Sequence, residues 1–402
     1  MKRRKAPSRS TFAANNARRL RVSVSMNGND HDRWMQRCLE LAARGAGHVS
    51  PNPMVGAVLV DVAGTVLGEG WHQAYGGPHA ERHAVAEALR RHSPEALRTA
   101  TLYLNLEPCN HQGKTPPCTE LILDKGIPRL VVGMVDPFPK VAGSGIARLR
   151  DRGVEVTVGV LEQDCRRFNE AFACHVATGR PLVTLKIAQT LDGHIATASG
   201  EARWISGEAA RRLTHRWRAE LDGMLVGSGT ARHDDPALTV RLVEGRQPVR
   251  LVLDRAGTLP PHLKLFCDAF RPLTTAVVGQ AAEPAYAEAL LAAGGRLLRL
   301  PETDGHLDLD ALLQRLGHDG AHDGLPMQSL LVEAGPGLAT ALLRQDLVDR
   351  FFLFVAPKLL GDGVRALTGL GVERLADALT FAEHSWEMSG EDFLFRGYLR
   401  KV

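Results

Sequence analysis

Short apolar segments alternate with helical segments along almost the whole chain, and this alternation limits the possible folds most. The first series of expected strands comprises 55–60, 101–105, 130–135 and 154–158, with helices expected over 32–44, 79–91 and 118–125. A second series of strands is expected at 182–187, 224–226, 249–253, 275–278, 330–332 and 351–355, with helices at 207–220 and 284–293. Because such alternation is typical of layered α/β domains, the pattern predicts two of them, over residues 30–176 and 177–402.

Length and composition exclude several other classes of protein. The chain has 402 residues, 44% of them apolar, so it can bury large cores without disulfides. It has neither the run of about 18 apolar residues that a membrane-spanning helix needs nor the N-terminal pattern of a secretion signal. The six cysteines are widely scattered, which favours a reducing compartment. We therefore expect a cytoplasmic protein with no membrane partner.

The N-terminal 29 residues differ from the rest in charge. Eight Lys and Arg lie between Lys2 and Arg21, and no acidic residue precedes Asp30. These eight belong to a total of 49 Lys and Arg against 45 Asp and Glu, so the remainder of the chain is net negative. Such a tail could bind nucleic acid or act as a targeting peptide. We favour a disordered extension, or a true start at Met26, because nucleic-acid binding and targeting are supported by composition alone.

The strongest chemical signal is His79-Ala80-Glu81, followed by Pro108-Cys109 and then by Pro117-Cys118. One imidazole and two thiolates bind zinc and leave a fourth tetrahedral position for water, as in catalytic sites. Zinc lowers the pKa of that water to about 7. Glu81 can reach the water without binding the metal, and can pass its proton to a departing amine. The pattern predicts a deaminase site, with zinc held by His79, Cys109 and Cys118 and with Glu81 as the catalytic residue.

The spacing of the two cysteines departs from the usual deaminase signature. Eight residues, 110–117, separate Cys109 from Cys118, where the signature has two. A strand-to-helix loop could hold this insertion, with Pro116-Pro117 setting the start of the next helix. The alternative is a scattered histidine and two buried free thiols. The remaining cysteines have no partners at ligand spacing, and we expect them to be buried thiols: Cys38, Cys165, Cys174 and Cys267.

Residues 51–56 (PNPMVG), 79–81 and 107–118 (EPCNHQGKTPPC) closely resemble the bifunctional riboflavin-biosynthesis deaminase/reductase family, which has the same long loop between its cysteines. The resemblance spans about residues 30–400. It departs at Met54 and Phe138, where the family usually has Asn, and at Ala202, where it often has Ser. The implied fold is a cytidine-deaminase-like α/β/α layered domain followed by a dihydrofolate-reductase-like α/β domain.

The second half offers glycine-containing junctions rather than nucleophiles. Gly335-Pro336-Gly337 lies between an expected strand and helix, where backbone amides can hold a phosphate, although a plain tight turn is the default. The resemblance implies an NADPH-dependent reductase. It places the cofactor at Ala188, Trp204, Thr230, Asp234, Gly335, Pro336, Gly337, Leu338, Ala339, Thr340 and Ala341. It places the substrate at Ala202, Arg218, Leu238, Arg241 and Glu333. Arg218 and Arg241 could pair with a phosphate.

The family implies two reactions on a small phosphorylated pyrimidine. The first is deamination of 2,5-diamino-6-ribosylamino-4(3H)-pyrimidinone 5′-phosphate, and the second is reduction of the ribosyl group to ribityl. One alternative is a nucleic-acid base deaminase, but the net acidic body and only 5% aromatic residues argue against stacking on single strands. Another is a zinc-stabilised binding module, which Glu81 and an open coordination position disfavour. We also expect a homo-oligomer and no nucleic-acid partner.

Overall fold

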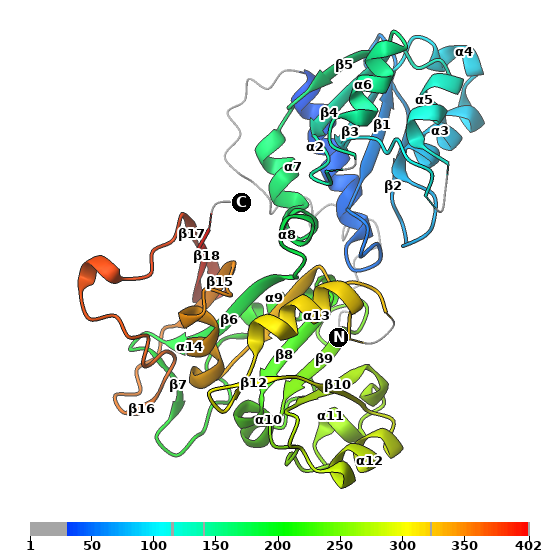
Figure 1. Cartoon of the computed structure of the whole chain (residues 1–402). Coiled ribbons are helices and arrows are strands. Elements are labelled where there is room, and N and C mark those ends of the chain that lie inside the picture. Colours follow the sequence, from blue (N-terminus) through cyan, green and yellow to red (C-terminus); the bar gives the residue numbers. More distant parts are fainter. Residues whose placement is uncertain (1–29, 114–115, 140, 322–323, 401–402) are drawn as a thin grey trace, which may run out of the picture. The chain divides into compact units, whose positions relative to one another are not determined.

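The computed structural model describes residues 30–113, 116–139, 141–321 and 324–400 (Figure 1). The expectations about the N-terminal tail lie outside these residues. The chain divides into two compact units, one holding 30–49 and 54–168 and the other 50–53 and 169–400. The division thus falls at Phe168, ahead of the junction at 176/177 expected from the sequence. Helix α8 (Glu170–Thr178) belongs to the second unit because Glu170 there pairs with Arg350, 2.6 Å away.

The first unit is a five-stranded sheet between two layers of helices. Its strands are β1 (Gly56–Val60), β2 (Val66–Trp71), β3 (Thr101–Leu106), β4 (Arg129–Met134) and β5 (Glu155–Val158), in the order β2-β1-β3-β4-β5. Strands β3, β4 and β5 run parallel, whereas β1 is antiparallel to both β2 and β3. The helices are α2 (Asp30–Ala42), α3 (Ala80–Arg91), α4 (Pro94–Leu97), α5 (Cys118–Asp124), α6 (Ser144–Asp151) and α7 (Glu162–Phe168).

Each face of this sheet packs against its own core. In β1 every residue is buried, because Ala57 and Leu59 face the core under α3, α5 and α6, while Val58 and Val60 face the core under α2 and α7. The sequence pattern did not predict β2. Gly68 and Gly70 in this strand lie directly under α3, where a Cβ atom would come within 2.3 Å of the Ala84 carbonyl oxygen and 2.4 Å of the Ala80 carbonyl oxygen. These glycines let α3 pack closely on the sheet.

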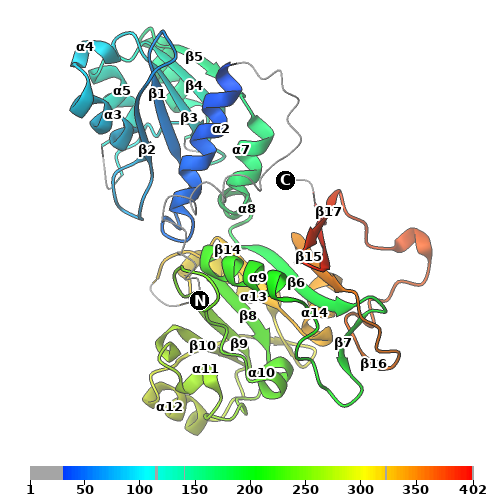
Figure 2. The same ribbon diagram turned by 180° about the vertical axis from the view of Figure 1, so that it is seen from behind.

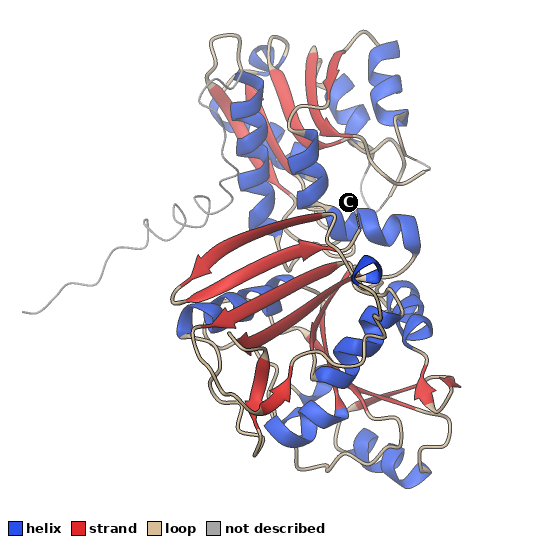
Figure 3. Cartoon of the chain, turned by 90° about the vertical axis from the view of Figure 1, so that its left-hand side faces the viewer, coloured by secondary structure: helices blue, strands red, loops and turns tan. Residues whose placement is uncertain are grey.

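The second unit is built on a nine-stranded sheet with helices on both faces (Figures 2 and 3). The strand order is β11-β10-β9-β8-β14-β6-β15-β18-β17. These strands are β6 (Leu182–Thr190), β8 (Gly223–Gly227), β9 (Val249–Leu253), β10 (Thr274–Val278), β11 (Arg296–Arg299), β14 (Ser329–Glu333), β15 (Arg350–Ala356), β17 (Glu383–Ser389) and β18 (Asp392–Tyr398). The first seven strands in this order, from β11 through β15, run parallel to one another. Strand β18 is antiparallel to β15, and β17 is antiparallel to β18.

The helices of this unit cover two separate cores, one on each face of the sheet. They are α9 (Glu208–Glu220), α10 (Ser228–Asp234), α11 (Lys264–Cys267), α12 (Pro284–Ala292), α13 (Leu309–Asp319) and α14 (Pro336–Arg344). Two small ribbons complete the unit: β12 (Glu302–Thr303) with β13 (His306–Leu307), and β7 (His194–Thr197) with β16 (Gly363–Arg365). Helices α13 and α14 pack on one core, and α9 to α12 on the other. Among the described residues, no helix is long and apolar enough to cross a membrane.

Candidate zinc centre and reductase cavity

His79 stands immediately before α3, as its N-cap residue. Its carbonyl oxygen accepts hydrogen bonds from the Arg82 and His83 amides, at 3.1 and 3.3 Å, which fixes its backbone at the start of the helix. The ring of His72 packs edge-on against the His79 ring, with 5.4 Å between centroids. His72 in turn lies 3.0 Å from the Pro78 carbonyl oxygen. The imidazole is therefore held between the end of β2 and the start of α3.

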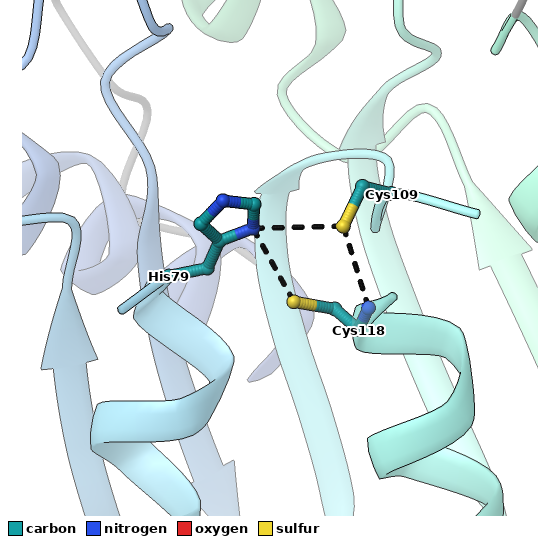
Figure 4. A group of neighbouring side chains, drawn as sticks. All are labelled: His79, Cys109 and Cys118. Atoms are coloured by element: carbon teal, nitrogen blue, oxygen red, sulfur yellow. Dashed lines mark hydrogen bonds between the residues drawn. The ribbon is translucent and has the colours of Figure 1, made fainter. Parts of the chain in front are cut away.

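The two cysteines approach His79 from neighbouring elements (Figure 4). Cys109 follows β3, and Cys118 is the first residue of α5. The His79 Nδ1 atom lies 3.5 Å from the Cys109 Sγ atom and 3.4 Å from the Cys118 Sγ atom. Tetrahedral zinc, with bonds of about 2.3 Å to sulfur and 2.0–2.1 Å to nitrogen, separates such atoms by about 3.5 Å. The geometry therefore fits one zinc ion.

The long loop between the cysteines does not disturb this arrangement. Pro117 is the N-cap of α5, consistent with the helix start expected from the sequence. The amide of Cys118 donates to the Cys109 sulfur at 3.3 Å, and Arg82 donates to the Pro116 carbonyl oxygen at 2.9 Å. Hydrogen bonds from Cys118 and His79 lower the pKa of the Cys109 thiol to about 4, which favours the thiolate that a metal needs.

Glu81 is buried in the first turn of α3, with 3% of its surface exposed. Its Oε2 atom has no hydrogen-bond partner among the described residues. Burial, together with the charge of Cys109, raises the pKa of this carboxyl. A buried polar atom without a partner is costly and points to a role beyond packing. Its position two residues from His79 suits proton transfer beside a metal-activated water.

Not every cysteine expectation is confirmed. Cys38 and Cys165 are buried, as expected for structural thiols, and Cys174 is half-buried. Cys267 is exposed, so the expectation of a buried thiol there was wrong. It ends the short helix α11, whose buried residues are Leu265 and Phe266, and its Sγ atom donates to the His262 carbonyl oxygen at 3.4 Å.

The second unit contains a cavity of about 1730 Å³ at the carboxyl ends of its parallel strands, where ligands bind in open α/β sheets. Most of the residues expected to contact cofactor or substrate line it: Ala188, Ala202, Trp204, Arg218, Thr230, Asp234, Leu238, Arg241, Glu333, Gly335, Pro336, Gly337, Leu338 and Ala341. They come from strands and loops separated by more than a hundred positions in the sequence. The fold therefore brings the two expected sets of contacts into one cavity.

Two residues of the expected cofactor segment do not line the cavity. Residues 336–341 are the first turns of α14, not a loop, so their side chains point in different directions. Ala339 is completely buried in the core, and the Thr340 hydroxyl donates to the Thr368 carbonyl oxygen at 2.8 Å. Gly335 is the N-cap of α14, where free backbone amides and the helix dipole favour a phosphate. The part of this segment that lines the cavity is thus 335–338 and Ala341.

A charged cluster lies on the floor of this cavity. Arg218 donates to both carboxylate oxygens of Glu333, at 2.7 and 3.0 Å, and to the Thr239 carbonyl oxygen at 3.1 Å. The Lys186 Nζ atom lies 4.0 Å from Glu333. Burial alone would raise the pKa of Glu333, but Arg218 and Lys186 outweigh it and hold that pKa at about 2. Because its guanidinium group already binds Glu333, Arg218 is less available for a phosphate than the sequence suggested.

Arg241 occupies a different position in the cavity. It is exposed, and the described residues offer its side chain no carboxylate partner within ion-pair distance. Its backbone amide donates to the His215 Nδ1 atom at 3.1 Å. Burial lowers the pKa of His215 to about 4, and the charges of Arg218 and Arg241 act in the same direction. The Arg241 guanidinium group thus lines the cavity without being held by a carboxylate of the described residues.

Lys186 is a site residue that the sequence interpretation did not select. Its side chain lines the cavity and is 14% exposed. Burial lowers the pKa of its ammonium group. The available signal was a single charged residue, a lysine, in the middle of the mostly buried strand LVTLKIAQT. A buried cation in such a strand needs a partner, and Glu333 provides it.

Comparisons with known proteins agree with both sites. Residues 28–134 match the family described as the cytidine and deoxycytidylate deaminase zinc-binding region, and residues 181–395 match the RibD C-terminal domain. The riboflavin biosynthesis protein RibD of Escherichia coli strain K12 is 40% identical over 362 residues, covering 87% of this chain and 94% of the relative. The corresponding protein of Aquifex aeolicus is 38% identical, covering 90% and 96%.

Solved structures give the same result over both units. RibD of Acinetobacter baumannii is 35% identical with a TM-score of 0.80, and the match covers 92% of this chain and 98% of that one. A Thermotoga maritima diaminohydroxyphosphoribosylaminopyrimidine deaminase/5-amino-6-(5-phosphoribosylamino)uracil reductase is 36% identical with a TM-score of 0.78 and the same coverage.

Fold, site and similarity define the class: a zinc-dependent pyrimidine deaminase joined to an NADPH-dependent reductase. The chain belongs to the bifunctional deaminase/reductase family of riboflavin biosynthesis. It therefore acts on small phosphorylated pyrimidines, as the sequence resemblance implied. The expected homo-oligomer, cytoplasmic location and lack of a nucleic-acid partner stay predictions.

Proposed function

We propose that His79, Cys109 and Cys118 hold one zinc ion and that Glu81 is the proton carrier of the deamination. The observation that carries this assignment is the cluster of three ligand atoms, all within 4.8 Å of one another, beside a buried carboxylate oxygen that has no partner in the described part of the chain. Zinc supplies a water of lowered pKa in its open fourth position.

In this assignment Glu81 moves protons and does not bind the metal. Deamination replaces the amino group of the pyrimidine by oxygen, so a proton must leave the attacking water and the departing nitrogen must gain one. A single carboxyl group of raised pKa can do both in turn, and burial gives Glu81 such a pKa. Its burial also keeps other water away from the proton it carries.

For the reduction we propose that the cofactor lies along Ala188, Trp204, Thr230, Asp234 and the start of α14. NADPH supplies the hydride. Gly335 and Gly337 suit a phosphate at this helix start, because a Cβ atom at Gly337 would meet only open space and one at Gly335 would lie 3.3 Å from the Thr230 hydroxyl. The amides there are thus accessible to a negatively charged group.

The substrate is proposed to contact Ala202, Leu238 and Arg241, with its phosphate on Arg241 and its opened sugar near Glu333. Opening the ribose ring breaks the bond between carbon 1 and the ring oxygen while the attached nitrogen forms a double bond to carbon 1, the carbon that would accept the hydride. The ring oxygen then needs a proton. Lys186 lines the cavity, and burial lowers the pKa of its ammonium group, so it is suited to donate this proton. Arg218 keeps Glu333 ionised, and Glu333 in turn keeps a cation at Lys186.

Metal analysis of the full chain tests the zinc assignment. Wild-type protein should contain one zinc per chain, and Cys118→Ala should lose it together with deamination, because two protein ligands do not make a stable zinc site. Cys267→Ala is the matched control, since this cysteine is exposed and outside the cluster, and it should keep one zinc. Full zinc occupancy in Cys118→Ala would remove the assignment.

A further inference from the structure

The carboxylate of Glu107 is buried without a counter-ion, yet it is fully hydrogen bonded. Only 4% of the residue is exposed, and no cation of the described chain pairs with it. Its Oε1 atom accepts from the amides of Gly145 and Ile146 at 2.9 and 3.2 Å, and its Oε2 atom from those of Asp136 and Gly143 at 3.2 and 2.9 Å. Three of these donors belong to the start of α6, where the helix dipole also favours a negative charge.

These four bonds hold both ends of one segment, Asp136–Ile146, which connects β4 to α6. Between its ends the segment also bonds to itself, since Val141 and Ala142 donate to the Phe138 carbonyl oxygen at 2.8 and 2.9 Å. Gly145 adds a close contact, because a Cβ atom there would lie 2.4 Å from the Pro108 carbonyl oxygen. The segment is therefore fastened to the end of β3 at Glu107 and Pro108.

Asn110, on the other side of Cys109, fastens the same segment. Its amide nitrogen donates to the Ser144 carbonyl oxygen at 3.4 Å, and its Oδ1 atom accepts from the Thr119 hydroxyl at 3.0 Å. Ser144 begins α6, and Thr119 follows the second cysteine in α5. The two polar residues that flank Pro108-Cys109 thus connect the cysteine to the segment and to α5.

The Asp136–Ile146 segment lies beside the zinc centre but supplies none of its three ligand atoms. Burial raises the pKa of the Asp136 carboxyl to about 6, and the charges of Glu107, His111 and Cys109 also act on it. The Asp136 amide bonds to Glu107, which stands two positions before Cys109 in the chain. Phe138 is 40% exposed, and its amide donates to the Asp136 carboxylate at 2.8 Å, so the segment has an aromatic ring that a ligand can reach.

We propose that Glu107 is a positioning residue for deamination, which holds the Asp136–Ile146 segment in place so that the segment can contact the pyrimidine. Glu107 touches neither the metal ligands' sulfur and nitrogen atoms nor the pyrimidine in this scheme, and it acts through four backbone amides. The inference rests on the zinc site proposed above. It predicts that loosening the segment weakens substrate binding while the metal stays bound.

The test is Glu107→Gln in the full chain. A glutamine has one acceptor oxygen, and its amino group would face two backbone donors, so two of the four bonds are lost. We expect the KM for deamination to rise about 10- to 100-fold, as for a buried group left unpaired, with kcat little changed. Zinc content should stay at one per chain and the reduction should be unaffected. Hydrogen exchange should become faster at Gly143, Gly145 and Ile146 but not in β3 or β4.

Two further variants separate positioning from folding. Glu155→Gln changes an exposed glutamate of β5 and should leave every measurement unchanged. Gly145→Ala keeps Glu107 but displaces α6 from Pro108, so it should raise the KM for deamination in the same way. It replaces Glu107→Gln as the test if that variant does not fold. The proposal would be overturned if Glu107→Gln lost zinc and its kcat fell in proportion while its KM stayed unchanged. It would also be overturned if neither the KM nor the rates of hydrogen exchange changed in this variant. Failure of the zinc assignment would be distinguishable, because wild-type protein would then lack the metal or Cys118→Ala would keep it.

Discussion

The two sites of this chain solve different chemical problems with different architectures. The zinc centre needs three side chains whose ligand atoms all lie within 4.8 Å of one another, placed at the ends of β3 and the starts of α3 and α5. The reductase cavity is about 1730 Å³ in volume and draws on β6, β8, β14 and the helices that follow them. A few ligand atoms can hold a single metal ion, whereas the cofactor and the substrate of the reduction together need a large binding surface.

The difference extends to electrostatics. In the first site the Glu81 Oε2 atom has no hydrogen-bond partner among the described residues, and burial raises the pKa of this carboxyl group. In the second, Glu333 is surrounded by cations and its pKa falls to about 2. The same chemical group thus has a raised pKa in one unit, as the proposed proton carrier needs, and a lowered pKa in the other. Variants that affect one activity and spare the other test this contrast.

Glu81→Gln should give the largest effect on the first site. General acid–base catalysis contributes about 10²–10⁴-fold, so deamination should fall by at least the lower figure while zinc is retained. Reduction should continue at the wild-type rate, since its residues lie in the other unit. Parallel assays of ammonia release and NADPH oxidation measure both activities, and wild-type deamination in this variant would reject Glu81 as the proton carrier.

Lys186→Met is the reciprocal variant in the second site. Methionine keeps the apolar stem but removes the ammonium group, so reduction should fall by a similar factor of about 10²–10⁴. Deamination should not change, and NADPH should still bind when followed by its fluorescence. If reduction persisted at near wild-type rates across the pH range, another group would have to protonate the ring oxygen.

Arg241→Ala should have a smaller effect, because it removes a binding contact and not a proton donor. Loss of a charged hydrogen-bond partner costs about 1.5–3 kcal/mol, or roughly 10- to 150-fold in affinity. The KM of the reduction for its phosphorylated substrate should rise by that factor, with little change in the KM for NADPH. Arg212→Ala, an exposed arginine of α9 paired with Glu208, is the control. The reverse pattern of KM changes would assign Arg241 to the cofactor.

His215 should give the smallest effect, and it concerns pH. Its pKa is about 4 in the folded protein and about 6.5 in an unfolded chain, so the unfolded state binds more protons between these values. Folding stability therefore decreases as the pH falls from 6.5 to 4. His215→Gln should remove on the order of 2 kcal/mol of that decrease, measured by urea unfolding at pH 7 and 4.5. The exposed His384→Gln should behave as wild type, and identical pH dependence in both variants would exclude this effect.

The zinc centre could be predicted from the sequence because its residues lie at fixed places in strand–helix junctions. His79 with Glu81, and Pro117 with Cys118, mark two helix starts, so their side chains had to meet at one edge of the sheet. The reductase cluster could not be predicted from residue patterns in the same way. Arg218 and Glu333 pair across 115 positions of sequence, and only the fold brings them together.

Strands without an apolar pattern were also missed. In β17 almost every residue is exposed, so the sheet edge leaves no periodicity to detect. In β2 three of the first five positions are small or polar, and the burial comes from the close approach of α3 over Gly68 and Gly70. Ala339 and Thr340 do not line the cavity because residues 336–341 are helical, so successive side chains point to different sides of the helix.

The tight fit of α3 on β2 has a genetic consequence. No side chain fits at Gly68 or Gly70 without moving helix backbone, so missense changes in either codon should inactivate the deaminase and make a cell depend on supplied riboflavin. The second unit has its own cores and should stay active in such an allele. Two defective alleles, one with Gly68→Val and the other with Arg241→Ala, should then complement each other when they are expressed in the same cell.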